Sequence, residues 1–167
     1  MVLIVALLCA TTLWTDLHYR KVPNLALALA LIAGALVSAL GYDDASLPLA
    51  ARVLGFALGF AVMLPAYLFG RMAAGDVKFF AVVGLFIGPS GLLPVWLTGT
   101  LLAFVHACLV LAFRHAEARG GVIAAVGQWP RRMRWFAAMT DQSRGIPYAA
   151  YLAVGVLLWI SVGQGHS

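Results

Sequence analysis

A run of 35 residues, 79–113, contains no Asp, Glu, Lys or Arg, and this run limits most strongly how the chain can fold. Such a stretch is stable in a lipid bilayer, where an α-helix satisfies its own backbone hydrogen bonds. Of the 167 residues, 63% are hydrophobic and only 10% are charged, whereas about 25% are charged in a typical soluble domain. We therefore predict an all-α integral membrane protein with a single membrane-embedded domain over residues 1–167.

The apolar residues form several segments, most of which are long enough to cross a bilayer. A transmembrane helix needs about 20 residues, so the first segment is slightly short and the fourth is clearly short. The fourth and fifth segments would form one very long helix unless the chain turns at GPSGLLP (88–94), which is rich in helix-breaking Gly and Pro. With that turn, we predict six transmembrane helices, the fourth of them short or tilted. The segments cover approximately 1–15, 23–40, 50–69, 77–89, 91–113 and 147–163.

The distribution of basic residues distinguishes the topology with one long helix from the topology with six spans. Six alternating spans place the loops 16–22, 70–78 and 114–146 on one side, and those loops hold ten of the eleven Lys and Arg residues. Cytoplasmic loops are enriched in basic residues, so we predict that these three loops are cytoplasmic and that both termini are outside. The net charge of +5 then reflects orientation in the membrane, and we predict no nucleic-acid partner. The ten residues are Arg20, Lys21, Arg71, Lys78, Arg114, Arg119, Arg131, Arg132, Arg134 and Arg144.

The long basic loop, at about 114–146, contains the stretch WPRRMRWF (129–136). Basic residues interleaved with aromatic ones are typical of a helix that lies on an anionic membrane surface. Contact with a substrate is the alternative interpretation of this loop.

Two of the six acidic residues, Asp16 and Asp76, lie where an apolar segment meets the predicted cytoplasmic face. Asp16 closes the first segment in TLWTDLHYRKVPN, and Asp76 opens the fourth in AAGDVKFF. One interpretation is structural. Asp76 would lie in the first turn of a helix, where the helix dipole favours an anion, and Asp16 would pair with Arg20 four residues later.

The other interpretation is a catalytic pair of carboxyl groups. Two neighbouring carboxyls share one proton because like charges at short range cannot both ionise. The carboxylate can then activate a water molecule, while the protonated partner stabilises the oxyanion and protonates the leaving amine. Such a pair needs no metal, and the four His and two Cys residues have no metal-ligand spacing. We predict neither a metal nor another cofactor.

Three elements of the sequence, in this order, resemble those of type IV prepilin peptidases, a family of GxGD membrane aspartyl proteases. TDLHYRKVPN (15–24) is similar to the D-x-x-x-R-x-I-P-N element that follows the first span of the family. GRMAAGDVKFFAVVGLFIGP (70–89) is similar to its G-x-x-G-x-G-D-x-K segment. RGIPYAAYLAVG (144–155) is similar to its closing element, at the start of the final helix.

The resemblance implies that Asp16 and Asp76 are the catalytic aspartates of a prepilin leader peptidase. It implies cleavage of a short basic leader after a glycine, at the cytoplasmic face of the bacterial inner membrane. The expected partners are the prepilin, the lipid bilayer, and pilus-assembly or secretion machinery. For Lys78, a role as a basic anchor of the topology remains the alternative. The other residues that match motif positions and would shape the site are Gly75, Lys78, Arg20, Pro23, Asn24 and Pro147.

Two departures from the family pattern matter. Ala73 replaces the first glycine of GxGD, which leaves the conformation of that loop open because glycine permits positive φ. The chain also lacks the cytoplasmic insert with paired CxxC motifs found in members that N-methylate their product. We therefore expect a peptidase without N-methyltransferase activity, similar to the short enzymes of tight-adherence (Flp) pili.

Two other functions are open. A presenilin-like intramembrane protease would pair GxGD with Tyr-Asp on another helix, whereas Thr15 precedes Asp16 here. A non-enzymatic membrane assembly or transport subunit would place ionisable residues near the middle of its spans, where this chain has only His106.

Overall fold

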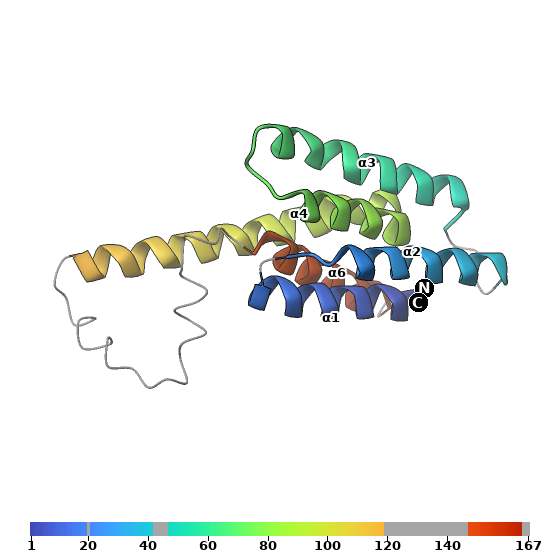
Figure 1. Cartoon of the computed structure of the whole chain (residues 1–167), viewed down its shortest axis with the longest axis horizontal. Helices are drawn as coiled ribbons and strands as arrows, with labels where there is room; N and C mark the ends of the chain where they lie inside the picture. Colours follow the sequence, from blue (N-terminus) through green and yellow to red (C-terminus); the bar gives the residue numbers. More distant parts are fainter. Residues whose placement is uncertain (20, 42–46, 119–146, 165–167) are drawn as a thin grey trace.

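The computed structural model describes residues 1–19, 21–41, 47–118 and 147–164. Within these ranges the regular structure is entirely helical (Figure 1). The helices are α1 (Val2–Tyr19), α2 (Asn24–Ala39), α3 (Leu49–Leu68), α4 (Ala74–Ala118) and α6 (Tyr148–Gln164). The all-α class is therefore confirmed. Of the loop predicted at about 114–146, residues 114–118 instead belong to the end of α4, and residues 119–146, with the WPRRMRWF stretch, lie outside the described residues.

Three of these helices are long and apolar enough to cross a membrane. They are α1, α3 and the part of α4 that ends at Ala112, whereas α2 and α6 are apolar but shorter. The protein is therefore a membrane protein with at least three candidate spans. The predicted count of six spans stays a prediction.

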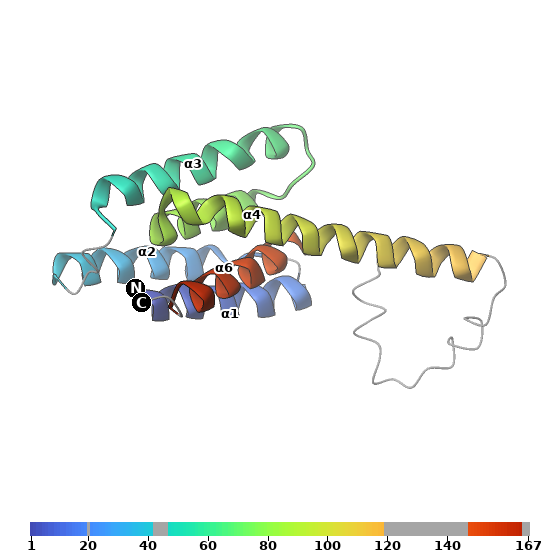
Figure 2. The same cartoon turned by 180° about the vertical axis from the view of Figure 1, so that it is seen from behind.

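Helix α4 is broken at Gly88, inside the predicted turn. Gly88 has φ 71° and ψ −180°, a combination that is essentially restricted to glycine. Figures 1 and 2 both show the chain reversing direction there, so that 74–87 and 89–118 run back past each other. The second segment of α4, 89–118, extends beyond the other helices. This reversal agrees with the predicted division of the uncharged run into two helices.

The first segment of α4 lies in the centre of the bundle. Five consecutive side chains, 79–83, are at most 3% exposed, which means that neighbouring helices surround this segment. Its short length is therefore compatible with a membrane protein, because protein rather than lipid covers it.

Small residues allow α3 to approach this central segment closely. Gly55 of α3 faces Gly84 of α4, and a Cβ atom on either would collide with the carbonyl oxygen of the other. One turn later, a Cβ on Gly59 would lie 2.9 Å from the carbonyl oxygen of Phe80. The GxxxG pair in α3 therefore mediates helix packing, as such pairs do in membranes.

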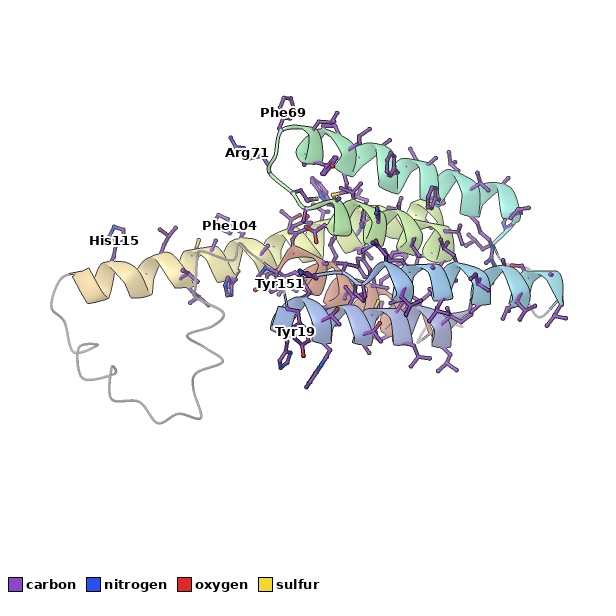
Figure 3. All side chains as sticks on the ribbon, viewed as in Figure 1. Tyr19, Phe69, Arg71, Phe104, His115 and Tyr151 are labelled. Carbon is purple, nitrogen blue, oxygen red and sulfur yellow. The ribbon has the colours of Figure 1, made fainter. Side chains whose placement is uncertain are left out.

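The end of α3 directs the chain toward Asp76 through a Schellman motif. The N–H of Gly70 donates to the carbonyl of Tyr67, and the N–H of Arg71 donates to that of Ala66, both at 2.9 Å. Gly70 has φ 68°, the left-handed conformation that this motif requires. Figure 3 shows Arg71 and Tyr19 at the same end of the bundle, although α1 carries Tyr19 and Arg71 follows α3.

The alternation of the helices predicts the outcome of a labelling experiment. In a background without Cys9 and Cys108, we expect single cysteines at positions 69 and 118 to react with an impermeant thiol reagent only from the cytoplasm. A cysteine at position 163 should react only from outside, because the end of α6 lies at the opposite end of the bundle (Figure 1). The cysteine-free parent is the control. Labelling of position 118 from outside would mean that 74–118 crosses the membrane once, and would refute the six-span topology.

Candidate active site

Asp16 and Asp76 line the same cavity, although 60 positions separate them in the chain. Asp16 lies in the last turn of α1 and Asp76 in the first turn of α4, and their side chains are only 5% and 8% exposed. The two carboxyl groups are close enough to interact electrostatically. Two buried carboxyls that interact in this way cannot both ionise at little cost, so this arrangement favours a shared proton.

The cavity has a volume of about 1060 Å³. Its walls come from the end of α1, the start of α2, the loop before α4, the first turns of α4, the second segment of α4, and the start of α6. Besides the two aspartates, the residues that line it include Lys21, Asn24, Arg71, Gly75, Lys78, Thr100, Ala103, Phe104, Ala107 and Tyr148.

The first turn of α6 supplies backbone donors to both aspartates. The N–H of Ala150 donates to Oδ2 of Asp16 at 2.9 Å, and the backbone N–H of Ala149 lies within hydrogen-bonding reach of the Asp76 carboxyl. The first N–H groups of a helix have no partner within the helix, and they lie at the positive end of its dipole. The start of α6 therefore binds the pair as it would bind an anion.

Pro147 immediately precedes α6 and is fully buried. Proline fixes φ and lacks an N–H group, which suits a position at the start of a helix. Pro147 was predicted through the resemblance, whereas Ala149 and Ala150 were missed. Their contribution comes from backbone N–H groups, which leave no signal in the side-chain pattern.

Asp76 also has the structural role that its place in the sequence suggested. It is the third residue of α4, its N–H donates to the carbonyl of Ala73 at 3.1 Å, and the Ala73 backbone interacts with its carboxyl group. The carboxyl therefore supplies one half of a capping box, in which the side chain at the third helical position reaches back to the backbone before the helix, whereas Ala73 has no side-chain acceptor for the other half. The capping role and membership of the carboxyl pair therefore occur together. The proposed pairing of Asp16 with Arg20 lies outside the described residues.

Lys78 and Asn24, two of the predicted site-shaping residues, contact each other. Nζ of Lys78 donates to Oδ1 of Asn24 at 3.4 Å, which links α4 to the first residue of α2. The contact is long and exposed, so its energetic contribution is small. Pro23 precedes Asn24 in an extended conformation, with φ −71° and ψ 121°, and starts α2.

The two positions of the GxGD signature differ in how tightly they are packed. A Cβ atom on Gly75 would lie 3.1 Å from Cβ of Val22, so a larger residue would push against the segment between α1 and α2. Ala73, which replaces the first glycine, is exposed. Ala73 also lines the cavity, so its methyl group borders open space and no neighbouring helix packs tightly around it.

Two further cavity residues were not singled out from the sequence. The hydroxyl of Tyr148, the first residue of α6, is 2.9 Å from Oγ1 of Thr100 on the second segment of α4. The signal available in the sequence was weak. Tyr148 directly follows Pro147 in the closing element, and Thr100 is a polar residue within an uncharged run.

Among the residues that the structure describes, no three His, Cys, Asp or Glu side chains gather as metal ligands would.

Comparison with known families finds a match over about two thirds of the chain. The sequence model of the type IV leader peptidase family matches residues 1–113. The matched range contains both aspartates of the cavity and ends before α6. Neither the comparison with curated proteins nor that with solved structures finds a match.

Proposed function

The chain belongs to the type IV leader peptidase family, and we propose that it is a membrane-embedded aspartic endopeptidase that cleaves type IV or Flp-type prepilins. One observation carries the catalytic assignment. The buried carboxyls of Asp16 and Asp76 interact within one cavity, and the start of α6 supplies N–H groups to both. Membership of the family supports the class of substrate.

In the proposed reaction, the pair of carboxyls holds one proton and one water molecule. The ionised carboxyl takes a proton from the water, whose oxygen bonds to the carbon of the scissile carbonyl. The protonated carboxyl gives its proton to the carbonyl oxygen and so stabilises the tetrahedral intermediate. The carboxyl that took the proton from the water then gives it to the nitrogen as the C–N bond breaks, and a hydroxyl of the intermediate returns its proton to the other carboxylate. The products are a carboxyl group on the leader and a free amine on the mature pilin.

The charges around the cavity suggest how the substrate lies. Lys21, Arg71 and Lys78 line the cavity and would repel a basic leader, so the leader extends away from them into the cytosol. The wall formed by Ala103, Phe104 and Ala107 is apolar and follows helical spacing. It suits the apolar helix that follows the leader. The scissile bond then lies at the cytoplasmic end of α1 and α4, next to the aspartates.

The lack of a large insert with paired CxxC motifs supports cleavage without N-methylation. The chain has only two cysteines, Cys9 buried and Cys108 exposed, which cannot supply such motifs. We therefore place the protein with the short peptidases of Flp-type systems, in the cytoplasmic membrane.

Co-expression with a tagged prepilin tests this proposal. We expect the wild-type protein to convert the prepilin to a smaller product on a gel. Replacing the glycine before the cut with a bulky residue should block conversion, because the glycine must enter between helices beside two buried side chains. Replacing one leader lysine should only slow conversion and serves as the control. Equal processing of the glycine and bulky substrates would exclude this substrate and favour a presenilin-like protease.

A further inference from the structure

We propose that Tyr148 is a positioning residue, whose hydroxyl holds the first turn of α6 against α4 so that the N–H groups of that turn stay on the two aspartates. This inference deepens the proposed function and rests on it only where cleavage is measured. Three observations on Tyr148 support it.

The first observation is where Tyr148 lies in the chain. It directly precedes Ala149 and Ala150, the two residues whose N–H groups reach Asp76 and Asp16. A shift of the Tyr148 backbone would therefore move both donors together. No other described side chain of α6 lines the cavity.

The second observation is what the hydroxyl contacts. It forms a 2.9 Å hydrogen bond with Oγ1 of Thr100, and the indole N–H of Trp96 also lies within hydrogen-bonding reach of it. Trp96 and Thr100 are one turn apart on α4, so they present their polar groups on one face. The hydroxyl of Tyr148 therefore connects the start of α6 to a single face of the second α4 segment.

The third observation separates this contact from ordinary packing. A phenylalanine would fill nearly the same space. The half-buried tyrosine adds a hydroxyl group that has two hydrogen-bonding partners, Thr100 and Trp96. Tyr148 also interacts electrostatically with Asp76. The hydroxyl is therefore part of the environment of the aspartate pair, and its removal should change the electrostatic surroundings of Asp76.

Steady-state kinetics of the purified protein in nanodiscs, with prepilin as substrate, test this role. Tyr148→Phe and Thr100→Val should each lower kcat about 3- to 10-fold, the effect of one hydrogen bond, and leave KM within about twofold. The double variant should be no slower than Tyr148→Phe, which already removes the contact that Thr100→Val removes. Thr100→Ser keeps the hydroxyl and should retain the wild-type kcat.

Hydrogen–deuterium exchange provides a test that does not need cleavage. The amide of Ala150 is protected by its bond to Asp16, so Tyr148→Phe and Thr100→Val should speed exchange at 149–150 about 3- to 10-fold. Tyr67→Phe, at a tyrosine that is 43% exposed on α3, is the control and should change nothing.

The outcomes separate this inference from the proposed function. Faster exchange in a protein that does not cleave prepilin would refute the function and support the positioning role. Unchanged exchange in the variants would overturn the positioning role, even if the wild-type protein cleaves prepilin. A rise in KM at constant kcat, or multiplied losses in the double variant, would also overturn it. A rise in KM would mean that Tyr148 contacts the substrate. Multiplied losses in the double variant would mean that the hydroxyls of Tyr148 and Thr100 act separately.

Discussion

Replacing either aspartate with asparagine, as Asp16→Asn or Asp76→Asn, is expected to lower the rate of prepilin cleavage by about 10²–10⁴-fold or more. Asparagine keeps the size and shape of the side chain but cannot exchange a proton. In the Asp16→Asn variant, the amide oxygen of the new side chain can still accept the hydrogen bond that Ala150 donates to Asp16, so the protein should remain folded. Single-turnover cleavage by purified variants in nanodiscs measures the effect, and thermal unfolding verifies that the variants are folded.

The same experiment tests whether the two carboxyls act as a unit. If they share one proton, the double variant Asp16→Asn/Asp76→Asn should be no slower than the slower single variant. Asp141→Asn, which removes an acid from the loop at about 114–146, is the matched control and should cleave at the wild-type rate. Cleavage at that rate by either Asp16→Asn or Asp76→Asn would rule out the two-aspartate mechanism.

Gly55→Ala should strongly destabilise the protein, although it adds only one methyl group. The added Cβ would collide with the carbonyl oxygen of Gly84 and lie 3.1 Å from the carbonyl carbon of Gly88. These are backbone atoms of a central, buried helix, and they cannot move aside as a flexible side chain would. Overpacking of this kind costs about 1–3 kcal/mol or more, so we expect a clear fall in Tm and in the yield of folded protein.

The Gly55 substitution should also lower activity, because the α4 segment that α3 would displace carries Asp76 in its first turn. Ala57→Leu adds a larger group to the exposed side of the same helix and is the control. We expect it to leave Tm and cleavage nearly unchanged. A Gly55→Ala protein with the Tm of the wild type would show that α3 and α4 do not pack as closely as described.

Much of the fold could be predicted because burial in lipid depends on local composition. The predicted segments 23–40, 50–69 and 147–163 differ by one residue at each end from α2, α3 and α6. The turn in the uncharged run was predicted at 88–94 and lies at Gly88, where the backbone requires glycine. The segment beginning at residue 77 in fact starts at Ala74, because Asp76 caps the first turn and extends the helix beyond its apolar residues.

The pairing of Asp16 with Asp76 was proposed from the alternation of spans and from a family resemblance, and both aspartates line one cavity in the structure. Charge and hydropathy determine at which membrane face a residue lies. They do not determine which residues at that face meet, since that depends on how the helices pack. Here the packing depends on glycines at the crossing of α3 and α4, where the two backbones approach each other.

The sequence by itself determined that this chain is helical, belongs in a membrane, and carries two acidic residues at predicted span ends, because each of these properties is local. Only the tertiary structure decided what surrounds the acidic pair. The bond from Ala150 to Asp16 joins residues 134 positions apart, and the contact between Tyr148 and Thr100 joins residues 48 apart. The family resemblance pointed to Pro147 at the start of this helix, but backbone N–H groups are the same in every residue except proline, so no pattern of side chains could reveal that Ala149 and Ala150 donate to the aspartates.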